Sequence, residues 1–340
     1  MIVAKPVDLR GRALRDLRVS VTDRCNMRCR YCMPREVFGP GFVFVPRDEL
    51  LRFEEITRTV AAFARAGVTK VRLTGGEPLL RASLPDLVSM LRAVDGIDDI
   101  ALTTNGSLLT RHAGKLREAG LGRITVSLDT LDPAAFSTVA DAEVTLDSVL
   151  AGIAAASSMG FAPIKLNAVI RRGWNDADIE RLAEFAREHG HVMRFIEYMD
   201  VGDTNGWRLD EVVPAAEIVE RLAHRWPLEA LPALYPGEVA NRFRYADGGG
   251  EVGVISSISK PFCGDCTRAR LSAIGEVYTC LFAATGHDLR ALLRSGADDD
   301  ALDLAVRNLW TARADRYSEL RALQPAGESV HKVEMSYIGG

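Results

Sequence analysis

Short apolar runs alternate with amphipathic stretches from residue 17 to about residue 224. Runs rich in β-branched residues predict strands, and apolar residues at helical spacing predict helices between them. The predicted strands cover residues 17–22, 70–74, 100–104, 123–128, 163–170 and 192–198. The predicted helices lie near residues 50–66, 83–92, 110–120, 145–159, 175–190 and 214–224, with Ser83 and Asn175 as capping residues.

Six strand–helix units with short links predict a parallel sheet with right-handed crossovers. Periodicity leaves open whether this α/β sheet is doubly wound or forms an incomplete barrel. In both arrangements ligands bind beyond the C-terminal ends of the strands. Polar residues concentrate at these positions, so we expect a functional rim there.

The character of the chain changes after about residue 227, where Gly and Pro become frequent. Hairpin strands are expected at residues 252–258 and 269–273, with a turn at 274–276, followed by helices near 287–294 and 298–313. We therefore divide the chain into a strand–helix core over residues 1–227 and a C-terminal region over residues 228–340, which ends in Gly-Gly.

Composition sets broad limits on the function. The 340 residues are 47% hydrophobic and 26% charged, with a net charge of -4. The protein as a whole is therefore not expected to bind nucleic acid, and an anionic ligand needs a local basic pocket. No apolar run approaches the ~20 residues of a membrane span, and the N-terminus lacks the apolar core of a signal peptide. We expect a cytoplasmic protein without a membrane partner.

The six cysteines form two groups of three. The first triplet is Cys25, Cys29 and Cys32, with C-x3-C-x2-C spacing. A structural zinc site uses four protein ligands, so zinc here would need a distant residue to complete the three cysteines. Three thiolates on a four-iron cluster instead leave one iron open, and we favour that interpretation. Arg28 and Arg30 flank these cysteines and are expected to favour thiolates. A disulfide framework is disfavoured because such scaffolds are usually small and exported.

The second triplet is Cys263, Cys266 and Cys280. A Cys-x2-Cys pair is a common zinc unit, and His287 is a candidate fourth ligand for that interpretation. A second four-iron cluster with an open iron fits better beside the first one.

Several basic residues lie inside predicted strands. Arg18, Arg72 and Lys165 belong to the first, second and fifth strands. Arg268 and Arg270 alternate along a later strand and should face one side. Such a group requires an anion, and a triphosphate suits arginine forks. The phosphate-binding loop of P-loop proteins is absent from the sequence.

The motifs together resemble the GTP 3′,8-cyclases, radical S-adenosylmethionine (SAM) enzymes that begin molybdenum cofactor biosynthesis. The resemblance rests on DLRVSVTDRCNMRCRYCMP, RLTGGEPLLR, LTTNG, RITVSLD, RFIEYMD, PFCGDCTRARLSAIGEVYTCLF and the Gly-Gly terminus. One departure is the segment STVADAEVTLDS after Phe136, which lacks a Gly-Arg-type loop.

The resemblance implies an incomplete TIM-type barrel of six strand–helix units, with a C-terminal extension that carries a second [4Fe–4S] cluster. It implies conversion of GTP to (8S)-3′,8-cyclo-7,8-dihydroguanosine 5′-triphosphate. SAM would bind the cluster on the first triplet, with further contacts from Tyr31, Gly76, Glu77, Ser127 and Met199. GTP would bind at the second triplet, with its triphosphate near Arg18, Arg72, Thr103, Lys165, Arg268 and Arg270.

The resemblance also assigns catalytic roles to Arg268, Arg270, Gly339 and Gly340. Two other interpretations of the tail are a frayed terminus and a ubiquitin-like activated carboxylate. The expected partners are GTP, a reducing electron donor and the cyclic pyranopterin monophosphate synthase that accepts the product, around a monomer or homodimer. Two functions compete with this one. A radical SAM maturase that modifies peptides should lack the five basic residues facing a triphosphate, and a non-enzymatic zinc-binding scaffold should contain zinc without sulfide.

Overall fold

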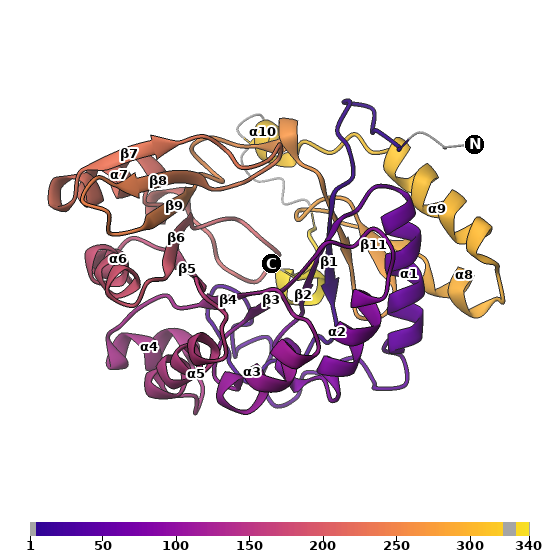
Figure 1. Cartoon of the computed structure of the whole chain (residues 1–340), viewed down its shortest axis with the longest axis horizontal. Helices are drawn as coiled ribbons and strands as arrows, with labels where there is room; N and C mark the ends of the chain where they lie inside the picture. Colours follow the sequence, from indigo (N-terminus) through magenta and orange to yellow (C-terminus); the bar gives the residue numbers. More distant parts are fainter. Residues whose placement is uncertain (1–4, 322–330, 340) are drawn as a thin grey trace.

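The computed structural model describes residues 5–321 and 331–339 and contains one twelve-stranded sheet (Figure 1). Six parallel strands lie in it in chain order: β1 (Asp16–Ser20), β2 (Lys70–Thr74), β3 (Asp99–Thr104), β4 (Arg123–Ser127), β5 (Lys165–Ile170) and β6 (Val192–Glu197). A doubly wound sheet reverses its strand order at a switch point. The sequential order therefore identifies an incomplete barrel, as expected from the resemblance.

Helices cover the outer side of these strands (Figure 1). They are α1 (Phe53–Arg65), α2 (Leu84–Arg92), α3 (Leu109–Glu118), α5 (Leu146–Ser158), α6 (Ile179–Glu188) and α7 (Ala215–Arg225). Leu17 and Val19 on β1, like Val71 and Leu73 on β2, are fully buried in the core. The residues between them face the opposite way because side chains alternate along a strand. The barrel interior therefore receives the polar positions.

The structure corrects three local predictions. The sequence analysis missed α4 (Pro133–Ala140), whose Asp132 cap accepts a hydrogen bond from the Ala135 amide at 2.8 Å. Ser83 precedes α2 but its side chain makes no capping bond. Asn175 precedes the short 3-10 helix η2 (Asp176–Asp178) and instead ties strands together, donating to the Asp129 and Val169 carbonyls. Both side chains were predicted as helix caps, and neither forms that bond.

The C-terminal region adds strands to both edges of the same sheet. Beyond β6 lie β9 (Glu251–Ile255), β8 (Asn241–Tyr245) and β7 (Leu228–Leu231), and beyond β1 lie β10 (Arg268–Leu271), β11 (Glu276–Tyr278) and β12 (His287–Asp288). The inner strands β9 and β10 run parallel to their neighbours β6 and β1. The later segment is thus continuous with the barrel wall.

Helices α8 (Arg290–Arg294), α9 (Asp299–Thr311), α10 (Tyr317–Leu320) and α11 (Met335–Ile338) complete the described chain, with short 3-10 helices η1 (Pro78–Leu80), η3 (Leu209–Glu211) and η4 (Cys263–Asp265). Helix α9 packs beside α1, and Arg65 forms an ion pair with Asp303 at 2.6 Å. Among the helices of the described residues, none has both the length and the apolar character needed to cross a membrane.

Candidate active site

Both cysteine triplets line a single cavity inside the barrel. The first triplet follows the C-terminal end of β1. Cys263 and Cys266 precede β10, which runs parallel to β1, and Cys280 follows the antiparallel β11. The second triplet therefore lies at the opposite end of the strands from the first. The rule that places ligands beyond the C-terminal ends of strands predicted the position of the first triplet only. It could not predict that of the second, because the direction of β10 in the sheet depends on the tertiary structure.

Backbone hydrogen bonds fix the loop of the first triplet. The Cys32 amide donates to the Cys29 carbonyl at 2.9 Å. The Arg28 amide donates to the Ala140 carbonyl at 2.8 Å, at the end of α4, and the Arg30 amide donates to Val139. The segment that departs from the family pattern after Phe136 thus begins in a helix that supports the cysteine loop.

Burial keeps the first triplet protonated in the ligand-free protein. It raises the pKa of Cys25 to about 11, with a further contribution from the charge of Glu77. Burial also raises the pKa of Cys29 and of Cys32. The charge of Arg28 does favour the Cys25 thiolate, as expected of a neighbouring arginine, but burial outweighs it. The Arg28 guanidinium itself donates to the Cys25, Met27 and Phe38 carbonyls. Thiolates here need a bound cation or cluster to offset burial.

The Gly75–Glu77 loop packs directly against the cysteine loop. A Cβ at Gly75 would overlap the Thr22 carbonyl, and one at Gly76 would overlap the Arg24 carbonyl, so neither position admits a side chain. The Glu77 carboxylate accepts hydrogen bonds from the Thr104 hydroxyl and the Asn105 amide, each at 2.7 Å. Burial raises the pKa of Glu77 to about 7, although these bonds oppose it. Glu77 therefore links β2 to β3, while Gly75 and Gly76 line the cavity.

Three other predicted SAM contacts, Tyr31, Ser127 and Met199, also line the cavity. The Tyr31 hydroxyl donates to Asp129 at 2.7 Å, and Asp129 in turn accepts from the Val169 amide at 2.8 Å. Burial raises the pKa of Asp129 to about 6. The structure thus brings Tyr31, from the cysteine loop, to the ends of β4 and β5.

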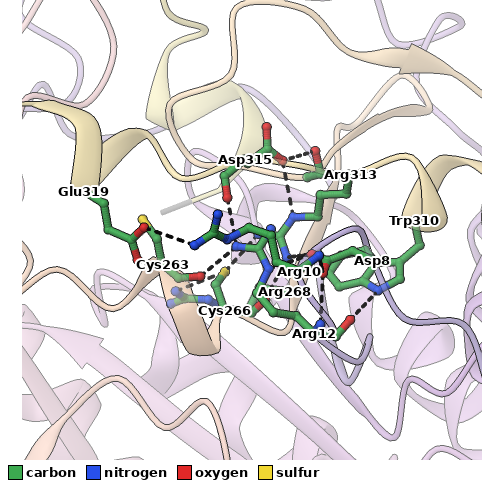
Figure 2. A network of polar contacts seen from close by, with 11 residues as sticks. Asp8, Arg10, Arg12, Cys263, Cys266, Arg268, Trp310, Arg313, Asp315 and Glu319 are labelled. Carbon is green, nitrogen blue, oxygen red and sulfur yellow. Dashed lines mark hydrogen bonds and ion pairs between the residues drawn. The ribbon is translucent and has the colours of Figure 1, made fainter. Parts of the chain in front are cut away.

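Arginines lie around Cys263 and Cys266 of the second triplet (Figure 2). Arg268 and Arg313 each approach the Cys266 sulfur, at 3.5 and 3.3 Å. Burial by itself raises the pKa of this thiol, but the charges of Arg268 and Arg313 outweigh it and lower the pKa to about 6. Burial raises the pKa of Cys280 to about 11. The second triplet is therefore electrostatically asymmetric, with one member favoured as a thiolate.

Neither cysteine triplet is arranged like the ligand shell of a single metal ion. Within residues 5–321 and 331–339, no three Cys, His, Asp or Glu side chains converge as the ligands of a single metal ion would. A four-iron cluster binds each thiolate at a different iron and does not need that convergence. His287, the candidate zinc ligand, lies on β12 and is exposed.

Basic side chains form a row between the two ends of the cavity. Arg270, Arg18 and Arg72 are register partners on three adjacent parallel strands, β10, β1 and β2. Burial and the neighbouring arginines lower the pKa of Arg18. Burial and Arg268 lower the pKa of Arg270 to about 10. Like charges opposite each other destabilise a sheet, so a bound anion would stabilise this row.

Lys165 lines a second, adjoining cavity, which shares Arg72 and Arg194 with the first. Burial and then the charge of Arg194 lower the pKa of Lys165 to about 8. Nearby, Lys70 differs in that it forms an ion pair with Asp16 at 3.0 Å. The predicted triphosphate residue Thr103 accepts a hydrogen bond from Arg72 at 3.0 Å.

The sequence analysis missed Arg194, Arg12 and Arg313. Arg194 lines both cavities, donates to Asn167 at 2.9 Å and has a pKa lowered to about 9, chiefly by burial. Its position between the buried Met193 and Phe195 was a usable signal, the same one that identified Arg72. Arg12 and Arg313 lie in segments without periodicity that points to the cavity, so no sequence signal identified them.

The C-terminal tail reaches the cavity. Met335 and Ser336 line it, and Arg270 donates a hydrogen bond to the Gly339 carbonyl. A Cβ at Gly339 would overlap the side chain of Thr74, so glycine is required at this approach. The tail is attached further back by Glu334, whose carboxylate accepts from the Asp203 amide at 3.0 Å. Gly340 lies outside the described residues.

The fold and the two cysteine sites define a radical SAM enzyme. Residues 19–186 match the Radical SAM superfamily, and residues 191–319 match Molybdenum Cofactor Synthesis C. The chain belongs to the GTP 3′,8-cyclase family. It is 65% identical to the GTP 3′,8-cyclase of Acidothermus cellulolyticus, over 98% of each chain, and 45% identical to that of Staphylococcus haemolyticus, over 100% of each.

The fold is shared more widely. The crystal structure of Streptococcus suis SuiB bound to S-adenosylmethionine has a TM-score of 0.60 at 15% identity, covering 91% of this chain and 74% of that one. At this identity the likeness concerns the fold alone.

Proposed function

We propose that the chain cyclises GTP between two [4Fe–4S] clusters held at opposite ends of one barrel cavity. The observation that carries this proposal is the arginine row of β10, β1 and β2, which lies between two partly buried cysteine triplets. The family supplies the reaction, conversion of GTP to (8S)-3′,8-cyclo-7,8-dihydroguanosine 5′-triphosphate. The arrangement of residues in this chain indicates which end of the cavity binds SAM and which binds GTP.

The first triplet is assigned to the cluster that binds SAM. Its three partly buried thiols line the cavity together and fit such a group, and desolvation leaves their thiolates unfavourable until iron binds. When bound, the cluster would supply the electron for reductive cleavage of SAM into methionine and a 5′-deoxyadenosyl radical, the species that would take the hydrogen atom from C3′ of the ribose. Gly76 offers its backbone beside the loop, and Tyr31, Ser127 and Met199 shape the adjoining wall. Glu77 acts by holding this loop against β3.

The second triplet is assigned to a second cluster, with the guanine of GTP beside it. The Cys266 thiol already has a lowered pKa because Arg268 and Arg313 approach it. The triphosphate is assigned to Arg18, Arg72, Lys165, Arg268 and Arg270. These charges repel one another in the ligand-free protein, so an anion of high charge relieves the repulsion as it binds. Arg194 extends the set from β6.

The tail is assigned a positioning role at the reacting ribose. Arg270 meets both the predicted triphosphate and the Gly339 carbonyl, and so connects substrate binding to tail placement. Helix α11 and the tail help to enclose the cavity on one side, which limits access of water to the reaction. Enclosure and orientation are the contributions that a protein makes to cofactor chemistry of this kind.

The remaining partners follow from the chemistry. Each turnover needs two electrons from an external donor: one for the cleavage of SAM and one, together with a proton, for the guanine radical that remains once C3′ has bonded to C8. Cyclic pyranopterin monophosphate synthase would take the product. All six cysteines are free thiols in the described structure, which supports a reducing compartment such as the cytoplasm.

We keep the division into residues 1–227 and 228–340 as a functional one, with one cluster in each part.

Anaerobic reconstitution followed by incubation with SAM, a reductant and each nucleoside triphosphate tests the proposal. We expect about eight irons per chain, as two four-iron clusters require, and deoxyadenosine formation that depends on GTP. Zinc without sulfide would contradict the cluster assignment. Deoxyadenosine that forms equally with every nucleotide, or only with a peptide, would contradict the substrate assignment and favour a maturase.

A further inference from the structure

Two buried arginines, Arg12 and Arg313, contact Cys263 and Cys266 of the second triplet. No sequence motif identified them. Arg313 follows α9, and Arg12 belongs to the N-terminal segment before β1. Both side chains are almost fully buried, with 1% and 2% of their surfaces exposed. Figure 2 shows them converging on Cys263 and Cys266 together with Asp8 and Asp315. Arginine is rarely buried this completely unless it is paired, so the contacts of this cluster decide what it does.

Arg313 spans both the backbone and the sulfur of Cys266. One terminal nitrogen donates to the Cys266 carbonyl at 2.7 Å, and the other approaches the Cys266 sulfur at 3.3 Å. The Nε atom donates to Asp315 at 3.2 Å, and the guanidinium lies 4.6 Å from the centre of the Trp310 ring. With every nitrogen engaged, the charge is held in a fixed position beside the sulfur.

Arg12 contacts the backbone of Cys263, not its sulfur. One terminal nitrogen donates to the Cys263 carbonyl at 2.6 Å and to the Asp315 carbonyl at 2.8 Å, while Nε donates to Asp8 at 2.6 Å. The other terminal nitrogen of Arg12 is buried and has no hydrogen-bond partner among the described residues. The Arg12 side chain also lines the cavity. An unsatisfied buried donor costs about 1–3 kcal/mol, so this nitrogen marks a place for an acceptor that belongs to a bound group.

Asp8 fixes both arginines. Its carboxylate is fully buried and accepts from Arg12 at 2.6 Å and from Arg313 at 3.4 Å, and also from the Arg10 and Arg12 amides at 2.9 Å. Trp310 adds a bond from its indole nitrogen to the Arg12 carbonyl at 2.9 Å. The arrangement is rigid, and rigid donors tune a metal group most effectively because they do not reorient when its charge changes.

We propose that Arg313 and Arg12 are positioning residues that raise the reduction potential of a cluster on the second triplet. Reduction adds one negative charge to such a cluster, and fixed hydrogen bonds and positive charge at its sulfur ligands favour the reduced form. At the first triplet the Cys25 sulfur accepts from the Met27 amide at 3.4 Å and lies 4.0 Å from the Asn105 side-chain nitrogen. Among the described residues no arginine bonds to a sulfur there, and Arg28 donates to carbonyls. The two ends of the cavity would then differ in potential, with the second cluster easier to reduce. This inference rests on the second cluster of the proposed function.

The test is a potentiometric titration of the second cluster, followed by electron paramagnetic resonance. The first triplet is replaced by alanine in every sample, so that only the second cluster gives a signal. We expect Arg313→Gln to lower the potential, so that at the parent midpoint the ratio of reduced to oxidised cluster falls at least tenfold. That is a change of 59 mV for a one-electron couple. Arg12→Gln should change the potential in the same direction.

Two further variants make the outcome decisive. Arg313→Lys keeps the charge but cannot bridge the carbonyl and the sulfur, so it should lower the potential by less than Arg313→Gln does; it carries the test if the glutamine variant loses the cluster. Arg65→Gln, which removes the exposed ion pair with Asp303 on α9, should leave the potential unchanged. An unchanged potential in the Arg313 variants, with iron and sulfide intact, would overturn the inference. Absence of any cluster on the second triplet of the parent protein would instead overturn the proposed function.

Discussion

Replacing Lys165 by methionine is expected to stabilise the ligand-free protein while it weakens GTP binding. Burial and then Arg194 lower the pKa of Lys165 from 10.5 to about 8. Among the described residues, none forms a hydrogen bond or ion pair with its ammonium group. Each pH unit of lowering corresponds to about 1.4 kcal/mol, so the charged form costs the folded protein up to about 3 kcal/mol at neutral pH. Methionine keeps an unbranched stem of similar size and removes this cost.

The sign of the pH dependence follows from proton linkage. Between pH 8 and 10.5 the unfolded chain binds a proton at Lys165 that the folded chain has released. The stability of the parent should therefore rise with pH across this window, and the cost is fully present below it. The methionine variant lacks this contribution, so its advantage over the parent should shrink as the pH approaches 10.5. Bound GTP should abolish the difference in slope, because phosphate restores the charged form.

Urea unfolding of the reconstituted protein, measured anaerobically near pH 7 and near pH 10, provides the free energies of unfolding. Calorimetry of GTP binding provides the affinity, which should fall about ten- to a hundredfold for one lost charge-assisted contact of roughly 1.5–3 kcal/mol. Lys70→Met is the matched control. It should destabilise the protein, because it leaves the half-buried Asp16 carboxylate without its 3.0 Å partner. If Lys165→Met destabilises the protein as Lys70→Met does, and leaves GTP binding unchanged, the reasoning about an unneutralised basic cavity is wrong.

Three further predictions address the proposed function. Alanine at any cysteine of the first triplet should abolish deoxyadenosine formation, whereas alanine in the second triplet should leave some SAM cleavage but no cyclised GTP. Both products are quantified by chromatography. Normal deoxyadenosine formation by a first-triplet variant would contradict the assignment. Arg268→Ala and Arg270→Ala should each weaken GTP about ten- to a hundredfold while SAM affinity stays near that of the parent, and equal losses for both ligands would indicate misfolding. Deleting Gly339 and Gly340, or appending a C-terminal tag, should abolish product formation while the clusters and GTP binding remain. A peptide matching the tail should restore some activity. Normal turnover by the truncated protein would show that the tail is not needed.

The sequence predicted the elements of the barrel well because each strand and helix carries its own periodicity. The strand at residues 70–74 was predicted with the observed bounds, and the other five core strands differ by one or two residues at their ends. The prediction of the barrel itself depended on family resemblance, since alternation of strands and helices does not specify strand order. Helix α4 was missed although Asp132 and Pro133 are a recognisable start for a helix.

Cysteine spacing and the positions of arginines within strands were sufficient to identify candidate ligands for two clusters and a triphosphate. These residues could be found because charge inside an apolar strand is visible in a linear sequence. Arg194 was available to the same reasoning on β6 and was overlooked. The electrostatic state of the thiols was not predictable in this way, because burial outweighs the nearby arginines at Cys25 and is outweighed by them at Cys266.

Only the tertiary structure decided where the candidate residues lie relative to one another. The parallel pairing of β10 with β1 puts the second triplet at the opposite end of the barrel from the first and aligns Arg270 with Arg18. Arg12 and Arg313 meet at Cys263 and Cys266 although about 300 residues separate them in the chain. Local sequence determines which elements form, because propensity and periodicity act over a few residues. Which elements meet depends on the packing of the whole chain, and the electrostatics of this cavity arise from that packing.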